Sequence, residues 1–422
     1  MSSRTDPLQM VRTELPSGLA TVIQAPPTSA RTFSISYVAP AGWGFEPPGV
    51  EGLASVAAKL MVQMPGRRSK EELARTLDRL GATLTSAVAA ESAEVTVWGP
   101  QDSWKRLLEI FGDAIFRPRF REEELARALR QLRERQLRQS VQPDLRAERD
   151  LLSAVFPLGH PYHSTGLGTA RSAARITPSR LERFHSRHFP ARGSVLAVTM
   201  RGTADSIVRS LAPHFPETDL RPDPSLPSLS EKRPKSSRLD IPIRGQSQVA
   251  IRMGGPSVSR SSPSYAALFL VNEVLGGRPL LSRLFQRIRE RHGLAYHASS
   301  ELESMRWAGY WEALAGTDPT TRDRVVDLML KEIQSLSSDL IPASELDRLR
   351  ESSLGSLPLE LETAASAHQL AVDVAYHGLP GDFYRTWPAR LRRLTSKDLR
   401  TAAETGFRSE GATVVTAGPA PA

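Results

Sequence analysis

An internal duplication constrains the fold of this chain more than any other feature of its sequence. Three pairs of segments recur in the same order along the chain. They are 106–115 with 324–333, 124–127 with 345–348, and 176–198 with 394–416. The offset is 218 residues for the first and third pairs and 221 for the second. Matches in one order at a nearly constant offset indicate two homologous halves.

Each half is predicted to be an α+β domain, a sheet covered by helices on one face. Residues 217–240 hold four prolines among Ser, Lys and Arg, which is typical of an extended linker. The predicted domains are therefore residues 1–216 and 241–422. Apolar residues that recur with a period of 2 or 3.6 residues predict the strands and helices of each domain. Strands are expected at 33–38, 195–198, 246–253 and 413–416, strand pairs at 13–23, 83–97 and 295–314, and helices at 51–64, 70–80, 265–275 and 280–291.

The composition excludes cysteine-dependent sites and argues against nucleic-acid binding. The chain has 422 residues and no Cys, which excludes disulfides, Cys-ligated metal sites and thiol nucleophiles. Its net charge is +9, and 48 of its 55 basic residues are Arg, a bias that also occurs in nucleic-acid-binding proteins. However, acidic residues are interspersed with the arginines, and aromatic residues make up only 6% of the chain. Without aromatic residues between basic clusters there is no stacking platform, so we expect no nucleic-acid partner.

Several familiar signals are absent from the sequence. The N-terminus lacks the apolar core of a signal peptide, and no apolar run is long enough to span a membrane. We therefore expect a cytoplasmic protein with no membrane partner. No phosphate-binding loop, nucleophile elbow or helical zinc-binding motif occurs either.

The nine histidines are the natural candidates for a metal site. His185 and His188 are three residues apart on a predicted helix, but no acidic third ligand is nearby, so we interpret them as packing residues. His160 and His163 flank a Pro-Tyr pair, and we interpret them as residues that cap a loop through hydrogen bonds.

Arg289 and Tyr296 form the most suggestive pair of side chains. Arg289 is in the last turns of a predicted helix, Gly293 ends that helix, and Tyr296 opens the next strand. A helix-to-strand corner can bring a guanidinium and a phenol seven residues apart close together. Both groups donate hydrogen bonds, so together they can hold a peptide carbonyl or a developing oxyanion. A purely structural role for the two side chains is the alternative.

The segment around this pair resembles a known family. Residues 277–296, with the preceding Val-Leu-Gly-Gly, are similar to the C-terminal signature of the pitrilysin-type metallopeptidases, which have an inverted zinc motif and include insulin-degrading enzyme and mitochondrial processing peptidase. Shorter matches occur at 15–18, 52–54, 80–82, 156–162 and 166–168, so the resemblance extends over essentially the whole chain. The resemblance implies two homologous α+β domains that face each other like a clam shell, and often a second chain that closes a chamber.

The sequence departs from this family at the zinc motif. Active members have H-x-x-E-H after the Gly-Leu-Ala element, whereas Ser55 and Lys59 occupy the two His positions here and Ala58 occupies the Glu position. The resemblance places the third ligand at Arg135, with Glu134 one residue away. A hydroxyl, a methyl group and two cations do not bind zinc. We therefore expect this chain to hold no zinc and no other cofactor.

The resemblance implies two hypotheses for function. In bacterial members with divided labour, one subunit has the zinc motif and the other provides the Arg/Tyr pair. This chain is similar to the second kind, so Arg289 and Tyr296 would contact the substrate or oxyanion at the zinc site of a homologous partner. The partner would hold the zinc, and the substrate would be a peptide or unfolded polypeptide. The alternative is a non-catalytic scaffold, like the core subunits of the cytochrome bc1 complex, with Arg289 in an internal ion pair, for example to Glu290.

Overall fold

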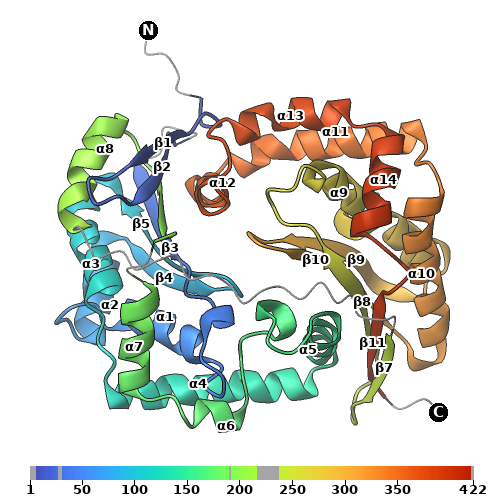
Figure 1. The fold of residues 1–422 in the computed structure, drawn as a ribbon, viewed down its shortest axis with the longest axis horizontal. Helices are drawn as coiled ribbons and strands as arrows, with labels where there is room; N and C mark the ends of the chain where they lie inside the picture. Colours follow the sequence, from blue (N-terminus) through green and yellow to red (C-terminus); the bar gives the residue numbers. More distant parts are fainter. Residues whose placement is uncertain (1–5, 27–30, 190–191, 216–236, 420–422) are drawn as a thin grey trace. The chain divides into compact units, whose positions relative to one another are not determined.

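The computed structural model describes residues 6–26, 31–189, 192–215 and 237–419. The chain divides into two compact units, each built on one β-sheet (Figure 1). The first unit comprises Met1–Gln136, Gly166–Pro227 and Leu357–Thr386, and the second comprises Leu137–Thr165, Ser228–Ser356 and Trp387–Ala422. Each unit therefore includes one segment from the other half of the sequence. The predicted domains are contiguous stretches of sequence and do not include this exchange of segments.

The sheet of the first unit has six strands in the order β1-β2-β6-β3-β5-β4, with β2 and β6 parallel and the other neighbours antiparallel. Its strands are β1 (Val11–Glu14), β2 (Ala20–Gln24), β3 (Thr32–Ala39), β4 (Thr83–Val88), β5 (Ala93–Pro100) and β6 (Val195–Thr199). The helices are α1 (Leu53–Gln63), α2 (Lys70–Leu80), α3 (Trp104–Phe116), α6 (Ala170–Ala173), α7 (Pro178–His188), α8 (Ala204–Leu211) and α12 (Ala364–Tyr376), together with most of α4 (Glu122–Val141).

The sheet of the second unit has five strands in the order β7-β11-β8-β10-β9. Its strands are β7 (Ser237–Pro242), β8 (Val249–Ser257), β9 (Ala295–Ser304), β10 (Gly309–Thr317) and β11 (Thr413–Gly418). The helices include α5 (Pro143–Val155), α9 (Tyr265–Asn272), α10 (Arg322–Ser338) and α14 (Ser396–Gly406), with α11 (Ala343–Glu360) and α13 (Phe383–Arg393) crossing the boundary between the units.

The two sheets repeat one topology, which confirms the α+β fold with an internal duplication. The order β7-β11-β8-β10-β9 corresponds to β2-β6-β3-β5-β4 of the first sheet. The predicted offset recurs in the helices, because α7 begins at residue 178 and α14 at 396. Both helices are capped by a threonine, since the side chains of Thr177 and Thr395 accept hydrogen bonds from backbone N–H groups of the first turn.

The first sheet is covered on both faces. Alternate residues of β3 point to opposite sides. Phe33 packs edge-on against Trp104 of α3, with ring centroids 4.6 Å apart. Ser36 faces the other way, and its hydroxyl lies 2.8 Å from Nε2 of His368 on α12, whose Nδ1 lies 2.9 Å from the hydroxyl of Thr199 on β6. Figure 1 shows α12, coloured as part of the C-terminal half, against this N-terminal sheet.

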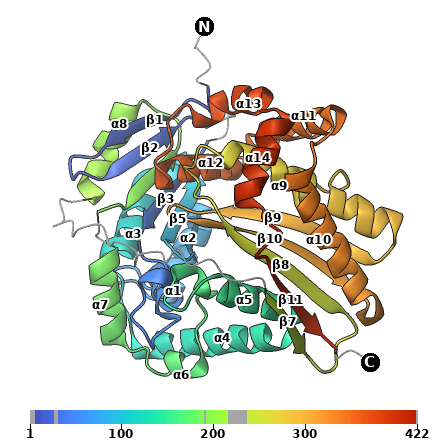
Figure 2. The same cartoon turned by 45° about the vertical axis from the view of Figure 1, so that its right-hand side comes forward.

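The second sheet has the same arrangement with the opposite exchange. Helix α5, from the N-terminal half, packs on β8 and β11 (Figure 2). Arg252 of β8 donates to Asp144 of α5 at 3.0 Å and forms an ion pair with Glu312 of β10. Helices α9, α10 and α14 lie on the core side, where Trp311 stacks on Phe407. The expectation that helices cover only one face of each sheet is therefore wrong, because the polar residues of the second face need partners and the exchanged helices supply them.

Two other sequence predictions need correction. Ser237–Asp240, predicted as the end of the linker, belong to β7, which pairs in parallel with β11. The prolines of the predicted linker lie outside the described residues. The segment predicted as a helix over 280–291 becomes helical only at residue 283, and Phe285–Arg291 form a π-helical turn. In the described part of the chain, no helix is both long and apolar enough to cross a membrane.

Acid is expected to weaken the attachment of α12 through His368. Burial lowers the pKa of His368 from 6.5 to about 3, so the unfolded chain binds a proton that the folded chain does not. Stability is therefore lost as the pH falls below 6.5, by about 2–3 kcal/mol through this residue at pH 4.5. Urea unfolding of wild type and His368→Gln at pH 7 and 4.5 should show a smaller pH effect in the variant. An equal pH effect in both proteins would contradict the prediction.

Candidate functional site

The structure brings Arg289 and Tyr296 together at a helix-to-strand corner. Gly293 adopts φ +61°, in the left-handed region that favours glycine, and its N–H donates to the carbonyl of Arg289 at 2.9 Å. The chain then reverses into β9. The guanidinium carbon of Arg289 lies 4.9 Å from the centroid of the Tyr296 ring, as the sequence argument expected, and 5.0 Å from that of Phe285.

The chemistry of this corner is that of an exposed hydrogen-bond donor pair. Tyr296 is 76% exposed, and Arg289 is half-buried. Among the described residues, no carboxylate lies within ion-pair distance of Arg289, so Glu290 does not occupy it. Cation–π contacts orient the guanidinium without using its N–H groups. The pair can therefore donate to a carbonyl or an oxyanion brought to this surface.

Phe285 is a functional candidate that the sequence argument missed. It lies four residues before Arg289 on the same helical segment, and its side chain is buried. Spacing of four residues places two side chains on the same side of a helix, so the Phe285–Arg289 contact was detectable in the sequence.

The degenerate zinc motif lies on α1, against α4. Ala58 is buried, and Ser55 and Lys59 are half-buried. The ammonium of Lys59 donates to Oε1 of Gln131 on α4. Burial lowers the pKa of Lys59, the nearby positive charge of Arg135 lowers it further, and Glu134 opposes this. Arg135 and Glu134 are thus close enough to α1 to act on Lys59.

These residues do not fit a zinc ion. Zinc requires deprotonated nitrogen, sulfur or carboxylate ligands, and the ammonium of Lys59 and the guanidinium of Arg135 would repel it. Glu134 provides one carboxylate, which is fewer than the three protein ligands of a catalytic zinc. Over residues 6–26, 31–189, 192–215 and 237–419, no three His, Asp or Glu side chains are grouped to hold a metal ion.

The histidines have the packing and capping contacts that the sequence suggested. Nε2 of His185 lies 2.7 Å from the carbonyl oxygen of Ile115, and His188 is buried. Nδ1 of His160 accepts from the N–H of Tyr162 at 3.1 Å, and Nδ1 of His163 lies 2.8 Å from the carbonyl oxygen of Phe156. Burial lowers the pKa of His160, His185 and His188, which favours the neutral form of these rings.

Glu46 is a second residue that the sequence argument did not identify, and it holds the start of α1 in place. The side-chain carboxyl group of Glu46 accepts hydrogen bonds from the backbone N–H groups of Gly52 and Ala54, at 3.0 and 2.7 Å. These groups begin the helix and have no partner within it. No local pattern marks Glu46, because its bonds reach six and eight residues along the chain.

Two duplicated sheet-and-helix units, with a vacated zinc motif on a helix of the first, define a protein of peptidase-like architecture. Family comparison agrees with this. Residues 21–165 match the description "Insulinase (Peptidase family M16)", and residues 175–353 match "Peptidase M16 inactive domain". The chain belongs to the insulinase family, peptidase family M16, as the resemblance in its motifs implied.

Relatives in sequence have names of both active and inactive proteins. An uncharacterized zinc protease of Mycobacterium bovis is 27% identical over 359 residues, 84% of this chain and 81% of the relative. The Helicobacter pylori protein named non-peptidase homolog YmxG is 22% identical over 350 residues, 81% of this chain and 79% of that protein.

Solved structures share the fold. A protein from Pseudomonas fluorescens described as a peptidase M16 inactive domain superposes with a TM-score of 0.90 at 20% identity, covering 97% of this chain and 98% of that one. The periplasmic protease PqqL of Escherichia coli superposes with a TM-score of 0.80 at 14% identity and covers 98% of this chain, which corresponds to 46% of PqqL.

Proposed function

We propose that this chain is the zinc-free subunit of a heterodimeric processing-peptidase-like metallopeptidase. Its partner would be a homologous chain that has the H-x-x-E-H motif and holds the zinc. Arg289 and Tyr296 would contact the peptide or unfolded polypeptide substrate at the partner's zinc site. By itself, the chain would have no peptidase activity.

The proposal rests on the contrast between the zinc-motif positions and the Arg289–Tyr296 pair. The zinc positions Ser55, Ala58, Lys59 and Arg135 have lost every ligand, whereas Arg289 and Tyr296 remain paired and accessible. The exposure of Tyr296 leaves its phenolic hydroxyl accessible to a substrate held at a partner's site.

The pair would act by electrostatic preorganisation. The rings of Phe285 and Tyr296 hold the guanidinium of Arg289 at 5.0 and 4.9 Å before substrate arrives. A fixed cation and a phenolic O–H aimed at a peptide carbonyl stabilise the negative charge that develops on its oxygen, with little reorganisation. The chemistry of bond cleavage belongs to the partner's site.

A non-catalytic scaffold is the second candidate. The name non-peptidase homolog of the Helicobacter pylori relative and the inactive-domain match of residues 175–353 favour it. A scaffold would bind its partner, but substitutions at Arg289 and Tyr296 would leave the partner's activity unchanged. We propose the cytoplasm as the location in either case, although PqqL is described as periplasmic.

The proposal is tested with the purified chain and a homologue from the same organism that has an intact H-x-x-E-H motif. We expect the chain alone to cleave no unstructured fluorogenic peptide and to hold less than about 0.1 equivalent of zinc, because its donor set repels the ion. Mixing the two chains should yield a complex that cleaves the peptide. A full equivalent of zinc in the isolated chain, or cleavage by it alone, would contradict the proposal.

A further inference from the structure

The interface between helix α5 and the second sheet has more acidic than basic groups. Arg252 of β8 is the cation at its centre, and its guanidinium forms an ion pair with Glu312 of β10 at 2.5 Å. The same guanidinium lies 3.0 Å from a carboxylate oxygen of Asp144 and 3.9 Å from one of Glu148, both on α5. Among the residues that the structure describes, none of these three acidic side chains has a second basic partner. Three carboxyl groups therefore share one guanidinium.

Two further carboxyl groups lie on the same face of this sheet. Directly opposite residues of an antiparallel pair point to one face, with Cβ atoms about 4.5–5.5 Å apart. Glu301 of β9 is opposite Glu312, and Glu303 is opposite Tyr310. Both β9 glutamates are exposed, and neither forms an ion pair within the described part of the chain. Since like charges directly opposite each other are destabilising, the pairing of Glu301 with Glu312 adds to the imbalance.

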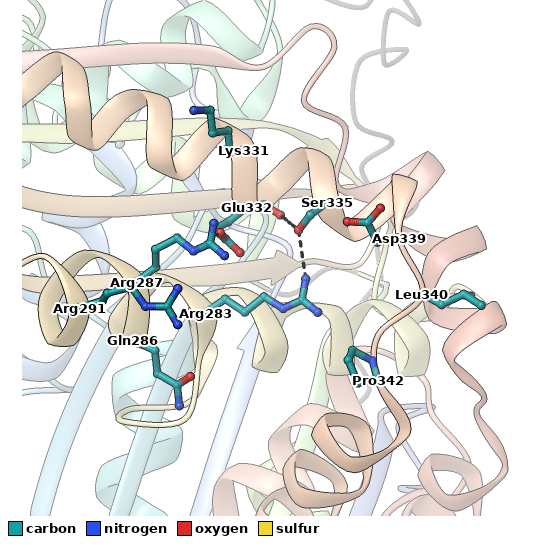
Figure 3. Close-up of a pocket in the computed structure, with 10 residues that line it drawn as sticks. All are labelled: Arg283, Gln286, Arg287, Arg291, Lys331, Glu332, Ser335, Asp339, Leu340 and Pro342. Carbon is teal, nitrogen blue, oxygen red and sulfur yellow. Dashed lines mark hydrogen bonds and ion pairs between the residues drawn. The ribbon is translucent and has the colours of Figure 1, made fainter.

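Two carboxylates on the core side of the second unit each have a guanidinium of their own. Arg283 donates to both carboxylate oxygens of Glu345, at 2.9 and 2.8 Å. Nε of Arg287 lies 2.8 Å from Oε1 of Glu332. Figure 3 shows the side chains of both arginines directed toward the helix that holds Glu332 and Ser335. The interface of α5 lacks this pairing, so mutual repulsion opposes the ionisation of its carboxyl groups.

The surroundings of the α5 interface hold protons on its carboxyl groups. Burial, together with neighbouring carboxylates, raises the pKa of Glu312 to about 6 even though Arg252 lowers it. Burial also raises the pKa of Glu148, and the charges of Asp144 and Glu301 act in the same direction. These two groups therefore ionise at a higher pH in the folded chain than in the unfolded chain.

The other titratable groups around this interface do not supply a second cation. Burial raises the pKa of Tyr310, which favours its neutral phenol. Arg146 and Arg149 of α5 both form ion pairs with an aspartate of the same helix. On the loop after α5, burial lowers the pKa of His160 to about 4, and His297 is exposed near the start of β9.

We propose that the contact between α5 and the second sheet is a pH-sensitive latch, which is tight in mildly acidic solution and loosens as the pH rises. When a carboxyl group of the interface ionises, its proton goes to solvent and its charge remains beside carboxylates that share only Arg252. A group that holds its proton more firmly in the folded state contributes stability at low pH, and this stability is lost as the pH rises.

Under this proposal the two exchanged helices respond to pH in opposite directions. Helix α12 depends on His368, whose neutral form is favoured by burial, so acid weakens its attachment. Helix α5 depends on carboxyl groups, so base weakens its attachment. Both exchanged segments are therefore firmly held only at intermediate pH. The latch is independent of the proposed peptidase role, because Arg289 and Tyr296 contact each other at a different corner of the second unit.

A single introduced thiol tests the latch, because the chain has no Cys. Ala147→Cys places the thiol on α5, at a side chain that is fully buried. Its rate of labelling by dithiodipyridine, divided by the rate for the urea-unfolded chain at the same pH, reports how often α5 opens. A carboxyl group that ionises near pH 6 when folded and near pH 4.5 when unfolded shifts this opening about tenfold between pH 5 and 8. We therefore expect the relative labelling rate to rise by about tenfold or more.

Three further variants separate the latch from a general response to pH. Ala403→Cys places a thiol on α14, which packs on the core side of the same sheet, and should show a smaller rise. Adding Glu148→Gln to the Ala147→Cys chain should reduce the rise at least about twofold, because an amide does not ionise. The matched control Glu351→Gln removes an exposed carboxylate elsewhere in the second unit and should leave the rise unchanged.

Two outcomes would overturn the proposal. One is an equal change for the thiols at positions 147 and 403, including no change in either. The other is an equal rise in the chains with Glu148→Gln and Glu351→Gln. Hydrogen exchange of residues 143–155 in wild type, compared with residues 396–406 at pH 5 and 8, repeats the measurement without any introduced side chain. Equal pH dependence of the two helices in that experiment would also overturn it.

Discussion

Replacing Arg252 with Ala is expected to lower the free energy of unfolding by about 3–5 kcal/mol. Arg252 of β8 lies 2.5 Å from a carboxylate oxygen of Glu312 on β10 and 3.0 Å from one of Asp144 on α5. The side chain of Glu312 is 5% exposed, so the substitution leaves a buried carboxylate without its cation. It also removes one ion pair between the exchanged helix α5 and the second sheet. Urea unfolding of wild type and variant measures the loss.

Two controls separate this effect from a general loss of charge. Arg238→Ala breaks ion pairs with Asp240 and Asp323, but Arg238 is 39% exposed, so the expected loss is at most about 1 kcal/mol. Replacing Arg252 and Glu312 together by Leu should recover much of the loss, because no unpaired buried charge remains. Equal losses for Arg252→Ala and Arg238→Ala would contradict the prediction.

The stability of Arg252→Ala should also depend on pH, because Glu312 is left buried without its cation. Burial raises the pKa of Glu312 to about 6 even though Arg252 lowers it, so removing Arg252 should raise the pKa further. An acid whose pKa is higher in the folded state than in the unfolded state loses stability as the pH rises. The deficit of Arg252→Ala relative to wild type should therefore be larger at pH 8 than at pH 5.

Local features of the fold were predictable from the sequence because their causes are local. Gly81 and Gly293 end helical segments with positive φ, and Ser69 with Glu72 forms a capping box at the start of α2. The duplication was visible because equivalent helices in both halves keep the same caps and apolar positions. The proximity of Arg289 and Tyr296 followed from one glycine at a helix end.

The exchanged helices were not predictable, because their causes are not local. Residues 143–155 and 364–376 show apolar helical faces, but no periodicity states which sheet a helix covers. Their partners are single polar residues far along the chain, as with His368 and Ser36, 332 positions apart. The π-helical turn at 285–291 likewise follows from tertiary packing, since its sequence has the pattern of an ordinary helix.

Replacing Arg289 with Ala is expected to lower kcat of the reconstituted two-chain peptidase by about 10²–10³-fold. Loss of one preorganised donor at an oxyanion costs about 2.7–4 kcal/mol of activation free energy. The effect should fall on kcat rather than on KM, since the contact strengthens as charge develops on the carbonyl oxygen. Arg289→Lys should recover only part of the rate, because an ammonium lacks the planar donor fork.

Tyr296→Phe distinguishes a chemical role from a packing role. The variant keeps the ring that lies 4.9 Å from the guanidinium carbon and removes only the phenolic O–H. If that hydroxyl donates to substrate, kcat falls although the cation–π contact persists; if Tyr296 only supports Arg289, kcat is unchanged. The matched control is Arg306→Ala, which removes an arginine stacked 5.3 Å from the ring of Trp307 between β9 and β10 and should leave kcat within about twofold of wild type. Full activity of both Arg289→Ala and Tyr296→Phe in the complex would exclude the catalytic contribution and favour the scaffold.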